Sequence, residues 1–130
     1  MDYRINDPKI DADHGEILQL LDSLTRVADS VPADELAARL VKLKDHVVIH
    51  FVDEEFILER QYEMPSAYVA RHKDEHRRIR KDVLARIASL RDAGHEAVRS
   101  GIVDIRNWIE THIRTVDAEM NLYLPSAQAD

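Results

Sequence analysis

The chain has 130 residues, the usual size of one domain, and 45% of them are hydrophobic while 33% are charged. Its formal net charge of −7 argues against nucleic acid or an anionic membrane as a partner, because both bind through basic patches. There is no cysteine, which excludes disulfides, thiolate metal sites and cysteine nucleophiles. No apolar run reaches membrane-spanning length or resembles a secretion signal. We therefore expect a single domain over residues 1–130, located in the cytoplasm.

Apolar residues recur at helical spacing in four stretches that follow a short N-terminal arm. We expect helices at residues 10–30, 33–62, 66–92 and 95–120. Ser66 is the predicted N-cap of the third helix, and Gly94 the predicted C-cap residue at its end. The fourth helix begins at His95 if Gly101 is tolerated inside it, and near Gly101 otherwise. Four helices of similar length with short connections predict an all-α, antiparallel, up-down-up-down four-helix bundle.

Each expected helix carries at least one histidine on its apolar face. Residues four apart on a helix share a face, so His50 and Glu54 point to one spot, as do His72 and His76. One histidine on an apolar face is usually a core residue with a satisfied hydrogen bond. Several converging imidazoles and a buried carboxylate without a partner would be costly, and a metal centre removes that cost. The candidate ligands are His14, His50, Glu54, His72, His76 and His112, and Asp117 is a further candidate.

Imidazole and carboxylate together suit a first-row metal such as iron. With Asp117 the set has five histidines and two carboxylates, too many for one ion, and it suits two ions with the carboxylates bridging. Asp117 is the weakest member by geometry, because five residues of α-helix turn it about 140° away from His112. Glu55 is rotated about 100° from Glu54 and is expected to matter little for the metal. His46 lies one turn before His50 and is expected to point into the bundle, either as a core histidine or hydrogen-bonded to a ligand.

The order of these motifs resembles that of the bacterial hemerythrin family over nearly the whole chain. The matching stretches are Ile10 to His14, His50-Phe51-Val52-Asp53-Glu54-Glu55, the pair His72 and His76, and Trp108 through His112 to Asp117. The resemblance assigns one iron to His72, His76 and His112, and the other, with an open position, to His14 and His50. It also implies that Glu54 and Asp117 bridge the two irons, together with an oxo or hydroxo group. The chain departs from the family at Tyr3 in the arm, at Met64 before Pro65, and at His46.

The resemblance implies reversible binding of dioxygen for storage, delivery or sensing, without enzymatic turnover. Apolar cover for the open iron is expected from Ile17, Trp108 and Ile109, which also fit ordinary core packing. One alternative is a di-iron peroxidase or nitric-oxide-handling protein, which would need a route for reductant and a proton donor; another is an iron-handling protein. Ferritin-like oxidases carry Glu-x-x-His motifs, and no histidine in this chain has a glutamate three residues before it. The expected partners are dioxygen and an oxygen-consuming protein of unspecified identity.

Overall fold

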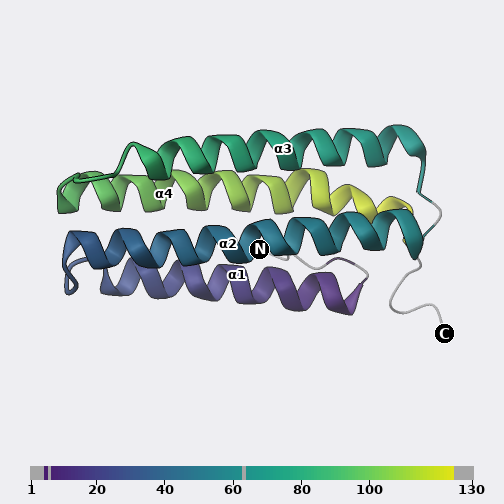
Figure 1. Cartoon of the computed structure of the whole chain (residues 1–130). Coiled ribbons are helices and arrows are strands. Elements are labelled where there is room, and N and C mark those ends of the chain that lie inside the picture. The colour runs from purple at the N-terminus through teal and green to yellow at the C-terminus, as the bar shows by residue number, and fades with distance from the viewer. Residues whose placement is uncertain (1–4, 6, 63, 125–130) are drawn as a thin grey trace.

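The computed structural model describes residues 5, 7–62 and 64–124, and this part of the chain forms four α-helices and no strand. The α-helices are α1 (Pro8–Val27), α2 (Ala33–Arg60), α3 (Ser66–Ala88) and α4 (His95–His112). A π-helix, η1 (Ile113–Asp117), and a 3-10 helix, η2 (Ala118–Leu122), continue α4. The helices lie side by side and alternate in direction (Figure 1), which confirms the expected antiparallel four-helix bundle. Tyr3 lies outside the described residues.

Helix α1 begins two residues earlier than expected, because Asp7 caps it. The Asp7 Oδ1 atom accepts the Ile10 N–H at 3.0 Å, and Pro8 in the first turn needs no partner for a backbone N–H. The Asp7 Oδ2 atom accepts the hydroxyl of Tyr62 at 2.6 Å. Partial burial and this carboxylate raise the pKa of Tyr62 to about 12. One aspartate therefore starts α1 and ties it to the residues that follow α2.

The predicted end of the third helix is wrong, since α3 stops at Ala88 and not at residue 92. A turn follows, in which the Ala93 N–H donates to the Leu90 carbonyl at 3.0 Å and Asp92 takes the left-handed φ of 60°. Gly94, the expected C-cap residue, has a φ of −75° and is the N-cap of α4.

Helix α3 begins at residue 66 as expected, but Pro65 occupies the N-cap position and Ser66 is already helical. Helix α4 begins at His95 and runs through Gly101. Gly101 is buried against Leu90, and an added Cβ would lie 2.7 Å from the Leu90 Cδ1 atom. Close packing between α4 and the turn before it therefore accounts for a glycine inside this helix.

The buried core consists of two apolar clusters. The larger cluster includes Ile17, Leu21, Phe51, Ile79 and Ile109. The smaller cluster includes Ile10, Leu58, Tyr68 and Met120. Buried polar residues separate the members of the two clusters along α1, α2 and α3, and along α4 with its continuation through η1 and η2. The fold thus places one polar layer across the bundle, between two apolar regions.

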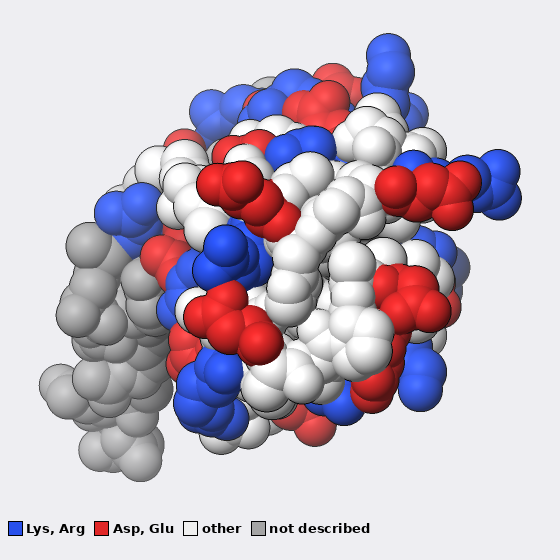
Figure 2. Space-filling model, turned by 90° about the vertical axis from the view of Figure 1, so that its left-hand side faces the viewer, with Lys and Arg blue, Asp and Glu red and all other residues white. Residues whose placement is uncertain are grey.

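Charged side chains of both signs are interspersed around uncharged surface at the end of the bundle that carries the α1–α2 and α3–α4 connections (Figure 2). Among the helices of the described residues, none is long and apolar enough to cross a membrane. The polar layer lies away from this end, towards the start of α1 and the end of α2 (Figure 1).

Candidate metal centre

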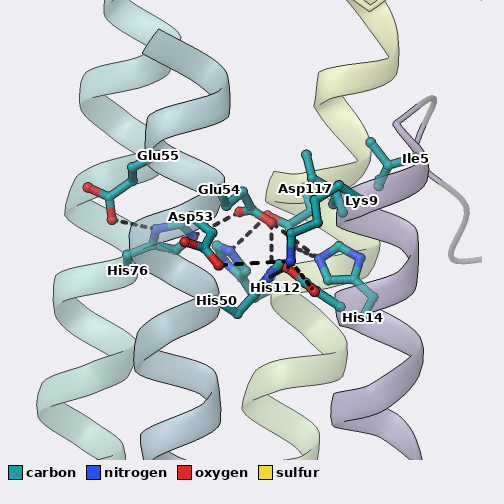
Figure 3. Close-up of polar contacts among 12 residues, drawn as sticks. Ile5, Lys9, His14, His50, Asp53, Glu54, Glu55, His76, His112 and Asp117 are labelled. Carbon is teal, nitrogen blue, oxygen red and sulfur yellow. Dashed lines mark hydrogen bonds and ion pairs between the residues drawn. The ribbon is translucent and has the colours of Figure 1, made fainter. Parts of the chain in front are cut away.

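The seven residues singled out in the sequence meet in the polar layer. Two overlapping groups of side chains place one ligand atom from each member within 4.8 Å of the others. The three-histidine group contains His72, His76, His112, Glu54 and Asp117, and the two-histidine group contains His14, His50, Glu54 and Asp117. Both carboxylates are sealed from solvent, with exposed fractions of 0% for Glu54 and 1% for Asp117. Figure 3 shows side chains from different helices pointing towards one another, namely those of His14, His50, Glu54, His76, His112 and Asp117.

The two oxygens of Glu54 serve different histidine groups. Glu54 Oε1 lies 2.6 Å from His72 Nε2 and 3.0 Å from His76 Nε2. Glu54 Oε2 lies 2.9 Å from His50 Nε2 and 3.3 Å from His14 Nε2. A carboxylate with one oxygen directed to each of two donor groups has the arrangement of a bridging ligand.

Asp117 divides its oxygens in the same way. Its Oδ1 atom lies 2.9 Å from Nε2 of both His72 and His112, and its Oδ2 atom lies 3.0 Å from His14 Nε2. An α-helix would turn Asp117 away from His112, but η1 between them is a π-helix. Its wider i→i+5 turn brings a residue five positions later back towards the same face. The unfavourable spacing seen in the sequence is therefore corrected by a local change of helix type.

The inward-facing donor atoms fit a metal better than they fit one another. Nε2 of His50 and of His112 each lie 2.9 Å from a carboxylate oxygen, yet neither has a hydrogen-bond partner with acceptable angles in the described part of the chain. Adjacent donors on an octahedral first-row metal with bonds of about 2.1 Å lie about 3.0 Å apart. The nitrogen-to-oxygen distances between 2.6 and 3.3 Å match this spacing. Imidazole and carboxylate are also a donor set that iron accepts.

The two buried carboxylates of the layer, Glu54 and Asp117, stabilise positive charge on the histidines around them. Burial would lower the pKa of the His14 imidazole, but hydrogen bonds to Asp117 and Glu54 outweigh this and raise it to about 10. The same competition raises the pKa of His72 to about 9. Burial and the Glu54 charge would raise the pKa of Asp117, but His112 and His14 hold it below its ordinary value. Without a metal, the two carboxylates therefore retain protons on neighbouring imidazoles.

The outer nitrogens of three histidines have partners that the sequence reasoning missed. The Tyr68 hydroxyl donates to the Val116 carbonyl at 2.7 Å, so its oxygen is free to accept from His72 Nδ1, 3.1 Å away. A carboxylate oxygen of Asp13 lies 3.1 Å from His50 Nδ1. These acceptors place the ring proton on Nδ1 and leave the Nε2 lone pair facing inwards.

Glu55 supplies the third of these acceptors, with its Oε2 atom 2.9 Å from His76 Nδ1. Glu55, which was expected to matter little for the metal, therefore contacts one of the clustered histidines, and its effect on metal binding stays a prediction. Its side chain does leave α2 at a different angle from Glu54, but that angle carries it to the outer nitrogen of His76. Histidine has two ring nitrogens, so a residue outside the cluster can still contact a ligand ring.

Apolar side chains cover the layer, and among them Phe51 is in ring contact with three of its histidines, His50, His76 and His112. The Phe51 ring stacks on His76 with centroids 3.9 Å apart and meets His112 edge-on at 5.8 Å. Of the residues predicted to cover the open iron, Ile17 and Ile109 are buried in the adjoining cluster, and Trp108 is half-buried against it. Their role as an oxygen pocket stays a prediction.

His46 does not face the cluster. Its side chain is 38% exposed, and its Nε2 atom lies 3.3 Å from the Glu16 carboxylate on α1. His46 lies eight residues before Glu54, and over eight residues of α-helix the side-chain direction turns by about 80°. This offset places His46 at the edge of the buried face. The expectation that it points into the bundle is wrong; it lines a shallow surface groove with Leu20 and Lys42.

Fold and site together define a four-helix-bundle protein with a buried cation-binding centre. The chain matches the family model of the hemerythrin HHE cation-binding domain over residues 7–124, and it belongs to the hemerythrin family. No curated protein matched the chain significantly. Family and donor set together are compatible with iron at this centre.

Proposed function

We propose that this protein binds dioxygen reversibly at a non-haem di-iron centre held by the seven clustered residues. The observation that carries the proposal is the division of each carboxylate between the two histidine groups. A single ion would not need two carboxylates with both of their oxygens in use. Two ions held side by side would share them, and each ion would gain anionic charge in a site that excludes water.

The two groups differ by one donor, which supports a binding position for a small ligand. The three-histidine group offers five protein donors and the two-histidine group offers four. With one further bridging oxygen, an octahedral ion in the first group would have no vacant position, and an ion in the second would have one. We therefore assign dioxygen to the side of His14 and His50. Iron, when bound, supplies the redox-active centre that takes up dioxygen.

The surroundings of the cluster favour binding over turnover. The five ligating histidines are at most 4% exposed, and the layer lies between two apolar clusters. Phe51 closes one side of it by stacking on His76. Restricted access of water slows proton delivery to a bound ligand, and loss of the ligand as a protonated product requires such delivery. The alternative is a peroxidase, nitric-oxide-handling or iron-handling role, and oxygen titration separates it from reversible binding.

The test is an optical titration of protein loaded anaerobically with two equivalents of ferrous iron per chain. We expect air to produce a charge-transfer band that disappears when oxygen is removed and returns on a second exposure. Phe51→Leu, which removes the stacked ring, should shorten the lifetime of the oxygenated state. Continuous oxygen consumption with an added reductant would instead establish an enzyme, and rapid loss of iron to a mild chelator would favour iron handling.

The proposal covers storage, delivery or sensing of oxygen, and delivery would require a protein partner that consumes oxygen. A cytoplasmic location stays a prediction from the sequence. Comparison of intracellular oxygen consumption in cells with and without the protein distinguishes a delivery role from a sensing role, because a sensor need not change the flux.

A further inference from the structure

A chain of polar contacts runs from the surface to one histidine of the cluster. The Lys9 amine lies 2.8 and 3.0 Å from the two Asp13 carboxylate oxygens, and one of these lies 3.1 Å from His50 Nδ1. Side-chain exposure falls along this path from 57% for Lys9 to 12% for Asp13 and 4% for His50. Lys9 also lies 3.9 Å from the Asp53 carboxylate (Figure 3).

Each histidine group has one ring whose Nδ1 atom lacks a partner among the described residues, His112 in one group and His14 in the other, but the three-histidine group has two supported rings and the two-histidine group has one. In the three-histidine group, the outer nitrogens of His72 and His76 contact Tyr68 and Glu55. In the two-histidine group, the His14 Nδ1 atom has no hydrogen-bond partner among the groups that the structure describes. His50 is thus the member of that group whose ring orientation is fixed from outside, and Asp13 fixes it.

We propose that Asp13, held in place by Lys9, is a positioning residue that orients His50 and thereby determines how tightly the two-histidine side retains its metal. The inference rests on the proposed two-metal centre. A carboxylate only accepts, so His50 must carry its proton on Nδ1 and direct the Nε2 lone pair inwards. A carboxylate partner also makes the imidazole a stronger donor to a cation.

The balance of donors explains why this contact affects one side more than the other. The two-histidine side has four protein donors, so a misplaced His50 removes a quarter of them. The three-histidine side has five donors and two externally supported rings. The positive charge of Lys9 keeps Asp13 directed to His50, but it acts weakly because the amine is exposed.

The experiment measures stoichiometry and affinity with zinc and, anaerobically, with ferrous iron, in competition with a chelator. For Asp13→Ala we expect one ion to bind as in the wild type and the other to bind about 10- to 100-fold more weakly. Asp13→Asn keeps an accepting oxygen without the charge and should lose less affinity than Asp13→Ala. Glu55→Ala is the matched control. It should weaken metal binding on the three-histidine side, where more donors and supported rings remain, and the loss of affinity should be smaller than in Asp13→Ala.

A second readout separates positioning from a general loss of structure. In metal-free protein labelled with nitrogen-15, the His50 Nδ1–H signal should be protected from exchange in the wild type and in Asp13→Asn, but not in Asp13→Ala. Unchanged affinity for both ions in Asp13→Ala would overturn the proposal, as would an equal loss of both ions. If the wild type itself binds fewer than two ions, the proposed function fails, while the protected signal still tests the contact.

Discussion

Replacement of Glu54 by glutamine tests the bridging arrangement directly. Glutamine keeps the shape of the side chain but removes the charge, and it replaces one of the two oxygens with a group that does not bind metals well. Glu54 approaches four of the five clustered histidines, with nitrogen-to-oxygen distances of 2.6 to 3.3 Å. Any ion held by either group would therefore lie within about 4 Å of the lost charge.

The expected loss follows from that distance. Two opposite unit charges about 4 Å apart attract each other by about 4 kcal/mol at an effective dielectric constant of about 20. Part of this lost attraction is offset, because the variant no longer has to bury a charged carboxylate. We expect both ions to bind Glu54→Gln at least about 100-fold more weakly, which is about 2.8 kcal/mol for each ion. Glu55→Gln is the control with the same chemical change; it touches only the outer nitrogen of His76 and should affect one ion by about tenfold.

The assay is anaerobic titration with ferrous iron against a competing chelator, with metal content measured after gel filtration. Circular dichroism of each metal-free variant checks that the helices remain. Loss of only one ion in Glu54→Gln would show that Glu54 is a terminal ligand and not a bridge. Equal effects of Glu54→Gln and Glu55→Gln would refute the distinction between inner and outer contacts.

The remaining predictions concern other residues in and around the layer. Because the pKa of His14 is raised from 6.5 to about 10, the stability that it contributes to the metal-free protein is complete below pH 6.5 and is lost as the pH rises towards 10. Urea unfolding at pH 6 and pH 10 should show this loss, and His14→Ala should reduce it, while His72, whose pKa is raised to about 9, keeps contributing to it. The same raised pKa means that metal loading at pH 7.5 should release protons, which calorimetry in buffers of different ionisation enthalpy measures; release of none would contradict a protonated His14 in the metal-free protein. Tyr68→Phe removes the oxygen that contacts His72 and leaves the Val116 carbonyl without this donor, so metal-free stability should fall by about 1–3 kcal/mol in urea titrations. His46→Leu should leave metal content and the autoxidation rate unchanged between pH 6 and 8, and an altered rate would mean that this exposed residue communicates with the centre.

Sequence periodicity was sufficient to predict the bundle and the inner position of most ligands. Apolar residues at helical spacing required four amphipathic helices, and short connections between them required antiparallel neighbours. Histidines within those apolar faces had to be buried together, whatever the details of packing. The start of α1 differed from expectation because the Asp7 side chain caps it, and the end of α3 differed because a turn that contains the left-handed Asp92 follows Ala88.

The tertiary structure decided which atoms meet. An ideal α-helix places Asp117 out of reach, and only the π-helix η1 returns it to His112. The division of carboxylate oxygens between two histidine groups depends on side-chain rotation, which residue spacing does not encode. The partners of the outer nitrogens come from other helices or from a neighbouring turn, as with Asp13 on α1 for His50 on α2. Spacing along one helix selects the residues that face inwards, whereas the contacts between helices select the nitrogen or oxygen that each residue presents.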